Sequence, residues 1–326
     1  MNGNYLDQLS QVCGVEEHRL VGGRGDGMRL FEVRNGLGLE FTVSADRCAD
    51  LSRLSFLGRN CGFFSMSGYV HPAYYDGVGK GSEKSFTGGF LATCGLSNVG
   101  APCVDEGEDL PLHGAVGNLP AERIFWDMDE ENITIKAVVA HGGFFADKLV
   151  LTRTITCSRT ENTLRLSDQI KNVGDRTVPL MLLYHINLGY PLLSERARLY
   201  IPSAQVTPRD PRAAEGMDAW SKVEPPQAGF KEQCYFHRFD DSGAAGLYNP
   251  ELGQGLMIRF DPEELPCFTQ WKMMGRSEYV MGLEPGNCYP GGRLEERRQG
   301  RLQTIAPGEE RRFTLCFELS TAAPAF

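Results

Sequence analysis

Histidine is scarce in this sequence, and the common metal-binding spacings are missing. Only six of the 326 residues are histidine, and neither HxH nor HExxH occurs. Ten cysteines are present, but no two form a CxxC pair, so a zinc knuckle is not expected. We therefore expect no bound metal and no cofactor. We also expect reduced cysteines that are buried as small core residues.

Long apolar runs and an excess of basic residues are missing as well. No apolar run reaches the roughly 18 residues that a membrane span needs, and the N-terminus lacks the basic and then apolar pattern of a signal peptide. The net charge is −9, which disfavours nucleic acid or an anionic membrane as the main partner. We expect a cytoplasmic protein with a small-molecule partner, no nucleic acid and no membrane. The oligomeric state stays open, with a homodimer as one alternative.

Helical periodicity is rare, and alternation of apolar and polar residues dominates. The best helix candidate is NYLDQLSQV at residues 4–12. In TLRLSDQIK, by contrast, Leu164, Leu166 and Ile170 fall on one face, and RRFTLCFEL near the C-terminus has the same period of two. Further strands are expected at 29–33, 39–43, 133–139, 148–155, 255–260, 268–271 and 278–284.

Turn signals separate these strands, and no linker divides the chain. NG at Asn35, NVGDR at Asn172 and NPELGQG at Asn249 are typical of turns. We predict an all-β fold, a large antiparallel β-sandwich that forms one domain over residues 1–326, with residues 1–27 as an extension packed on it. Residues 202–229 are rich in proline, alanine and charge and predict a long loop over the sandwich, which is typical of a binding-site wall.

Two polar residues interrupt the apolar stretch LLYHINLGYPLL. In a strand, His185, Asn187 and Gly189 point to one face, while Tyr184 and its alternate neighbours point to the other. A buried polar side chain costs stability unless it is paired. These residues are therefore either hydrogen-bonded inside the sandwich or exposed to a functional site.

A carboxylate and a second histidine have similar settings. In YVMGLEPGNCYPGGR, Glu284 shares a strand face with Gly282, and Pro285 ends the strand. His113 lies in a His-Gly loop, and His141 in AHGGFF is a similar site that could compete with it. A solvated glutamate and a loop histidine remain alternatives. Two histidines and a glutamate are also compatible with a metal site or with metal-free acid–base chemistry.

Taken together, LHG, YHINLGYP and LEPGN resemble motifs of the galactose mutarotase-like (aldose 1-epimerase) superfamily. The closest resemblance, through FTGGFLATCGLSNVG and QWKMMGRSEYVMGLEPGNCYPGGR, is to a poorly characterised aldose 1-epimerase-like branch. It covers roughly residues 28–319. The resemblance implies a β-supersandwich with a sugar-binding cleft. It also implies that Glu284 is the general base, that His185 is the general acid, and that His113 binds and polarises the sugar.

One departure from the superfamily concerns substrate binding. The arginine of its GRxxNR-like segment has no match in GGFLATCGLSNVG, so Asn98 or Arg47 is expected to take part of its place. Trp271 suits stacking on a sugar, with Lys272 on the opposite strand face, although a buried core tryptophan is an equal alternative. The expected substrate-binding residues are Arg47, Asn98, Asn187, Asp210, Trp271 and Arg293.

The implied activity is interconversion of the α and β anomers of an aldose or modified sugar by acid–base catalysis, as part of carbohydrate metabolism. Two alternatives stay open. One is a sugar-binding or regulatory protein without turnover, which the missing arginine favours. The other is a metal-assisted sugar isomerase or epimerase, since one fold hosts many functions.

Overall fold

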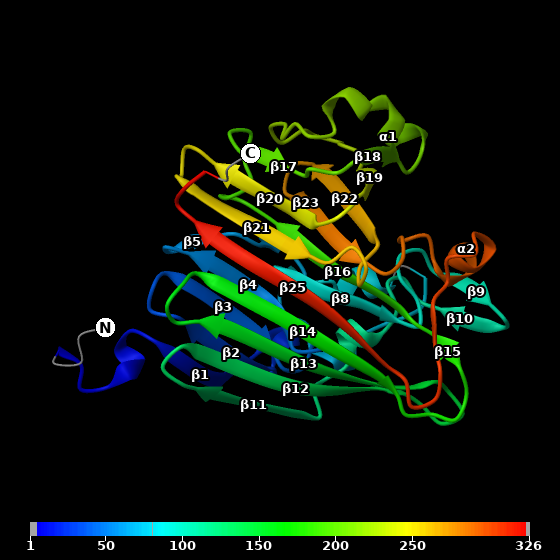
Figure 1. Ribbon diagram of the computed structural model, residues 1–326, viewed down its shortest axis with the longest axis horizontal. Helices are drawn as coiled ribbons and strands as arrows, with labels where there is room; N and C mark the ends of the chain where they lie inside the picture. Colours follow the sequence, from blue (N-terminus) through cyan, green and yellow to red (C-terminus); the bar gives the residue numbers. More distant parts are fainter. Residues whose placement is uncertain (1–4, 80, 324–326) are drawn as a thin grey trace.

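The predicted all-β architecture is confirmed. A computed structural model describes residues 5–79 and 81–323, and its larger sheets are antiparallel (Figure 1). Each strand expected from alternation is present. The strand order of the eight-stranded sheet is β11 (Arg123–Met128), β12 (Asn132–Gly142), β13 (Lys148–Ser158), β14 (Thr163–Asn172), β25 (Glu310–Ser320), β21 (Gln254–Phe260), β20 (Gly243–Asn249) and β17 (Arg198–Tyr200).

Two further large sheets and three small ones complete the fold. The six-stranded sheet has the order β18 (Gln205–Pro208), β19 (Gln233–Arg238), β22 (Cys267–Met274), β23 (Tyr279–Gly286), β16 (Met181–Leu188) and β8 (Leu91–Leu96). The five-stranded sheet has the order β1 (Gly14–Arg19), β2 (Arg29–Arg34), β3 (Leu39–Ser44), β4 (Asp50–Phe56) and β5 (Arg59–Asn60). The two-stranded sheets pair β6 (Phe63–Phe64) with β7 (Gly88–Gly89), β9 (Cys103–Asp105) with β10 (Glu108–Leu110), and β15 (Val178–Pro179) with β24 (Thr304–Ile305).

The eight-stranded sheet covers the other two large sheets. Phe268 of β22 stacks on Phe260 of β21, and Phe90 packs edge-on against Phe317 of β25. At the other sheet, Arg153 of β13 contacts Asp50 of β4. Figure 1 shows the eight-stranded sheet in front of the five-stranded and six-stranded sheets. The core between the layers is formed by the inward half of each alternating strand.

A buried ionic cluster lies inside this core. Arg153 is 0% exposed and donates two hydrogen bonds to Asp168 (2.9 and 2.7 Å) and one to Asp50 (2.6 Å). Its Nη2 also donates to Thr93 of β8 (2.8 Å), and the Tyr184 hydroxyl donates to Asp168 (2.9 Å). The cluster therefore joins strands of all three large sheets. Because Tyr184 is anchored on the inner face of β16, its neighbour His185 is held on the outer face.

Two expectations about irregular segments need correction. The helix expected at residues 4–12 is wrong over the described residues: Asn4 lies outside them, and Leu9–Gln11 form a 3₁₀ helix between non-helical residues at 6–8 and 12. The long loop expected at 202–229 contains β18, α1 (Pro211–Glu215) and the 3₁₀ helix Met217–Ala219. The other helical segments are α2 (Arg293–Arg298) and the 3₁₀ helices Gly23–Gly25, Pro72–Tyr74, Gly81–Ser85 and Val116–Asn118.

The state of the cysteines and the character of the helices agree with what the sequence predicts. All ten cysteines are free, and eight of them are buried, as expected for small core residues. Within residues 5–79 and 81–323, no helix has the length and apolar character needed to cross a membrane. From within residues 1–27, β1 pairs with β2 along its full length, which ties this segment to the five-stranded sheet.

Candidate functional site

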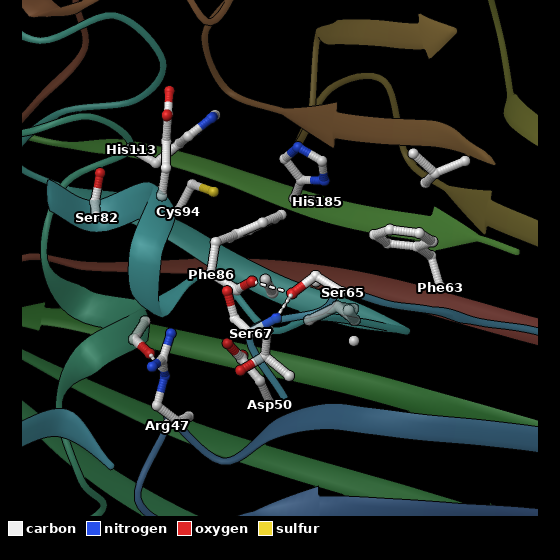
Figure 2. A pocket seen from close by; sticks show the side chains of 18 of the residues that line it. Arg47, Asp50, Phe63, Ser65, Ser67, Ser82, Phe86, Cys94, His113 and His185 are labelled. Carbon is white, nitrogen blue, oxygen red and sulfur yellow. Dashed lines mark hydrogen bonds between the residues drawn. The ribbon is translucent and has the colours of Figure 1, made fainter. Parts of the chain in front are cut away.

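A pocket of about 590 Å³ opens on the outer face of the six-stranded sheet. Its floor includes Ala92 and Cys94 of β8, His185 of β16, and Trp271 and Met273 of β22, which alternate with the core-facing residues of the same strands. Segments 63–69 and 82–89, the turn after β3 and the His113 loop form its walls. Figure 2 shows His113 and His185 at one end of the pocket and Arg47 and Asp50 at the other, with Phe86 between them.

His185 is held at the pocket wall by three aromatic rings. Phe86, His113 and Trp271 each meet its imidazole edge-on, with ring centroids 5.5, 5.5 and 5.3 Å away. Only 5% of His185 is exposed. Among the described residues its Nδ1 has no hydrogen-bond partner. The aromatic contacts fix the ring plane, so the two ring nitrogens have defined directions.

Glu284 is the nearest charged partner of His185. It lies on β23 beside β16, and its Oε1 is 3.3 Å from His185 Nε2. Only 2% of Glu284 is exposed, and it contacts His185 without lining the described pocket itself. Gly282 leaves room for the carboxylate, because a Cβ atom at this position would overlap Glu284 Oε1. The structure thus brings together two of the residues that the sequence placed on separate apolar strands.

Burial moves both members of this pair toward their neutral forms. Loss of hydration, together with a smaller effect of His113, lowers the pKa of His185 to about 3. Loss of hydration raises the pKa of Glu284 well above its ordinary value, and the charge of Glu232 adds to this. A neutral histidine beside a protonated glutamate carries the same number of protons as an imidazolium beside a carboxylate. Burial thus favours the neutral form of both groups, and the imidazolium–carboxylate form differs from it only by transfer of one proton from Glu284 to His185.

His113 presents an N–H group toward the pocket. The backbone N–H of Gly100 donates to His113 Nδ1 at 3.3 Å, so Nδ1 carries a lone pair and the proton of the neutral ring is on Nε2. Loss of hydration lowers the pKa of His113 to about 4, which keeps the ring neutral at pH 7. His141, the alternative His-Gly site, lies on β12 of the eight-stranded sheet and is not part of the pocket wall.

Trp271 is fixed by a carboxylate that the sequence analysis did not single out. Trp271 Nε1 donates to Glu232 Oε2 at 2.7 Å, and Arg209 Nη2 donates to the other oxygen of Glu232 at 3.0 Å. Both Trp271 and Glu232 line the pocket, whereas Lys272 points to the opposite face and donates to the Ala219 carbonyl at 2.8 Å. The indole is therefore oriented from its polar edge.

Four of the expected substrate-binding residues make their hydrogen bonds within the protein. Asn187 donates to the His185 carbonyl, and Asp210 caps α1 by accepting from the Ala213 N–H at 2.9 Å. Asn98 Oδ1 accepts from the Arg293 N–H at 2.7 Å, and the Arg293 guanidinium binds Asp105 and Glu108. None of these four side chains is part of the wall of the described pocket.

Arg47 does line the pocket, and much of its guanidinium is engaged with backbone. Its Nε donates to the Gly117 carbonyl at 2.9 Å, and its Nη1 donates to the carbonyls of Val70 and Ser85 at 3.1 and 3.2 Å. These bonds tie together three loops that form the end of the pocket opposite His185. Loss of hydration lowers the pKa of Arg47, and Asp50 opposes this effect.

Sequence reasoning missed the pocket residues that come from loops. Phe86, Glu232 and Asn118 carry no periodic signal, because their positions depend on contacts between distant segments. Glu232 follows a lysine just before β19 and resembles an ordinary surface residue in the sequence. Over residues 5–79 and 81–323, no three His, Cys, Asp or Glu side chains are grouped as metal ligands.

Comparison with known proteins identifies the class to which this fold belongs. A protein from Klebsiella pneumoniae described as a "putative aldose 1-epimerase" superimposes with a TM-score of 0.88 at 27% identity, over 94% of this chain and 83% of that one. A galactose mutarotase-like protein from Clostridium acetobutylicum (TM-score 0.69, 12% identity, 95% and 99% covered) shares the fold. So does galactose 1-epimerase from Lactobacillus acidophilus (0.64, 14%, 94% and 99%). The protein is thus a galactose mutarotase-like β-sandwich, and the resemblance inferred from its motifs is confirmed.

Within this class the family can be named. Residues 25–319 match the family described as "Domain of unknown function (DUF4432)", and the chain belongs to this family. No curated protein matches the sequence.

Proposed function

We propose that this protein interconverts the anomers of a free sugar by metal-free acid–base catalysis in the pocket. The observation that carries the proposal is the buried His185–Glu284 pair, 3.3 Å apart, of which His185 lines the pocket. Anomer exchange requires a base at the C1 hydroxyl and an acid at the ring oxygen. Because both oxygens are bonded to the same carbon, the two groups must lie close together, as they do here.

In the forward reaction Glu284 accepts the proton of the C1 hydroxyl while His185 donates a proton to the ring oxygen. The bond between C1 and the ring oxygen breaks, and C1 becomes the carbonyl carbon of an open-chain aldehyde. Rotation about C1–C2 presents the other face of the carbonyl. The ring oxygen then attacks C1, His185 takes back its proton, and Glu284 returns its proton to O1. The pair ends with the one proton it started with, so no redox step is needed.

The surrounding groups have distinct roles in this proposal. His113 donates its Nε2–H to a sugar oxygen and remains neutral, consistent with its lowered pKa of about 4. Trp271 covers the apolar C–H face of the sugar ring, and its bond to Glu232 orients the indole. Phe86 and Trp271 also exclude water from His185, which strengthens its interaction with Glu284.

The names of solved relatives support the proposed chemistry. Two of the three structures compared above carry names that refer to aldose or galactose 1-epimerases, and the Klebsiella protein is the one with the higher identity. The fold alone does not determine which sugar is bound.

The test is the rate of anomer exchange, measured by magnetisation-transfer NMR on a panel of neutral and charged aldoses. We expect faster exchange on at least one sugar with the wild type, and a loss of about 10²-fold or more in Glu284→Gln and in His185→Asn. His18→Asn is the matched control, since His18 is a surface residue on β1. Wild-type rates in both site variants would refute the proposal.

A sugar-binding protein without turnover is the second candidate, and one observation favours it. His185 and Glu284 are only 5% and 2% exposed, so a sugar has limited access to the pair. Saturable binding without accelerated exchange on any sugar of the panel would support this alternative.

A further inference from the structure

The pocket is larger than one sugar ring requires. Even at about 30 Å³ per non-hydrogen atom, the share of one water molecule in the liquid, the roughly 12 such atoms of a hexose fill only about 360 Å³. Of the 590 Å³ in the pocket, about 230 Å³ would remain unfilled by a hexose placed against His185. A two-ring ligand of roughly 23 non-hydrogen atoms occupies about 690 Å³ on the same scale, so it would fill the pocket and project from its opening. A ligand that uses the whole pocket therefore extends beyond the reacting ring.

The remaining space lies at the end that Arg47 closes. Figure 2 shows Arg47 and Asp50 across the pocket from His113 and His185, with the Arg47 guanidinium directed toward the interior. Gly117 and Asn118 belong to this end, since Arg47 Nε is bonded to the Gly117 carbonyl. Ser44 lines the same end from the last position of β3.

Polar atoms at this end lack partners within the protein. Ser44 is only 2% exposed, and among the described residues its hydroxyl makes no hydrogen bond. Asn118 Oδ1 is likewise buried and unpaired in the described part of the chain. An unpaired buried hydroxyl or amide oxygen costs about 1–3 kcal/mol. Ser44 and Asn118 both line the pocket. A ligand hydroxyl group can donate a hydrogen bond to the Asn118 amide oxygen, and it can donate to or accept from the Ser44 hydroxyl.

Charge at this end is balanced, which disfavours an anionic ligand. The guanidinium groups of Arg47 and Arg153 face the carboxylates of Asp50 and Asp168, and Asp50 is already bonded to Arg153 and to Thr93. Among the described residues that line the pocket, Arg47 is the only lysine or arginine, and it faces Asp50, so it is not free to pair with a phosphate or carboxylate group. Phe86, Tyr69 and Phe63 supply apolar wall between the two ends, suited to the C–H face of a second ring.

We propose that the pocket has a second sugar subsite, formed by Ser44, Arg47 and Asn118, and that the substrate is a neutral reducing disaccharide. This inference rests on the proposed function. The reducing ring lies at His185 and Glu284, where its free C1 hydroxyl is required. The non-reducing ring lies at the Arg47 end and accepts or donates hydrogen bonds there.

The test compares glucose and galactose with maltose, cellobiose, lactose and melibiose in the anomer-exchange assay. We expect kcat/KM to be about tenfold higher for at least one disaccharide than for its reducing monosaccharide. Ser44→Ala should lower kcat/KM for that disaccharide three- to tenfold more than for the monosaccharide, through loss of about one hydrogen bond. Ser167→Ala on the surface of β14 is the matched control.

Binding separates this inference from the proposed function. If no sugar shows accelerated exchange, the proposed function fails, and calorimetric titration with the same sugars still tests the subsite. Tighter binding of a disaccharide than of its monosaccharide, with the gain lost in Ser44→Ala, supports the second subsite. Equal values for both sugars, or equal losses for both in Ser44→Ala, would overturn it.

Discussion

Gly282 provides a test of the acid–base pair that leaves both catalytic residues in place. It lies on β23 opposite Trp271 and two residues before Glu284. A methyl group added here would overlap Glu284 Oε1 and would lie 2.9 Å from Trp271 Cβ. The carboxylate is the flexible end of its side chain, so it moves while the strand stays in register. Gly282→Ala is therefore expected to displace the base without removing it.

The size of the effect follows from this displacement. To restore an ordinary contact the carboxylate must retreat by about 1 Å, and a shift of this size in a catalytic group costs roughly 10²-fold in rate. Overpacking against Trp271 Cβ is expected to lower the free energy of unfolding by about 1–3 kcal/mol. Activity should thus fall much further than stability.

The assay is anomer exchange by NMR together with denaturant unfolding of the same variant. Gly143→Ala, in the β12–β13 hairpin, is the matched control, because its added methyl group meets only Ala146 Cβ at 3.5 Å. Wild-type exchange in a folded Gly282→Ala protein would show that the position of Glu284 does not matter. That result would refute the reasoning.

Three further predictions concern one pocket residue and two buried groups of the core. Glu232→Leu releases the Trp271 indole and should raise KM more than it lowers kcat. Glu232→Gln keeps an acceptor for the indole and should have a KM close to that of wild type; equal KM values in the two variants would contradict this. Burial lowers the pKa of His237 to about 4, below its unfolded value of about 6.5, so the unfolded chain binds more protons between these values. The free energy of unfolding should therefore fall by roughly 3 kcal/mol through His237 as pH falls from 6.5 to 4. In His237→Gln the free energy of unfolding should depend less steeply on pH over this range, and an unchanged dependence would contradict the prediction. Arg153→Met leaves two buried carboxylates without their partner and should cost about 3–5 kcal/mol of unfolding free energy; a loss under about 1 kcal/mol would contradict this.

The strands could be predicted because burial imposes a period of two on them. The same period also contains a signal for a buried ion pair. Arg153 falls in phase with Leu151 and Ile155, and Asp168 falls in phase with Leu166 and Ile170. A charged residue in the apolar phase of two neighbouring strands predicts a buried ion pair, and the structure pairs these two positions directly across β13 and β14.

Asp210, one of the expected substrate-binding residues, caps a helix, and local capping rules explain why. Asp210 is followed by proline, which is the signature of a helix N-cap with proline at the first helical position. The structure has this arrangement at α1. The roles of Asn98 and Arg293 depend on contacts between segments almost 200 residues apart, and no local pattern contains that information.

Some features of the pocket could be predicted from the sequence and others could not. The face shared by His185 and Asn187 followed from strand geometry, and so did the opposite orientations of Trp271 and Lys272. The approach of His185 to Glu284 did not follow, because it requires β16 to neighbour β23 across about 100 intervening residues. The motif resemblance implied roles for both residues in one cleft but not their direct contact. Neither the strand pattern nor the resemblance predicted the position of the loops that carry Arg47 and Phe86.

The central claim is that the pair of His185 and Glu284 transfers protons to and from a sugar. Its most direct test is the anomer-exchange rate of wild type and Glu284→Gln on the same sugar at the same enzyme concentration. The account predicts a loss of about 10²-fold or more in a variant that still folds and still binds the sugar. A Glu284→Gln protein that binds the sugar and exchanges its anomers at the wild-type rate would contradict it.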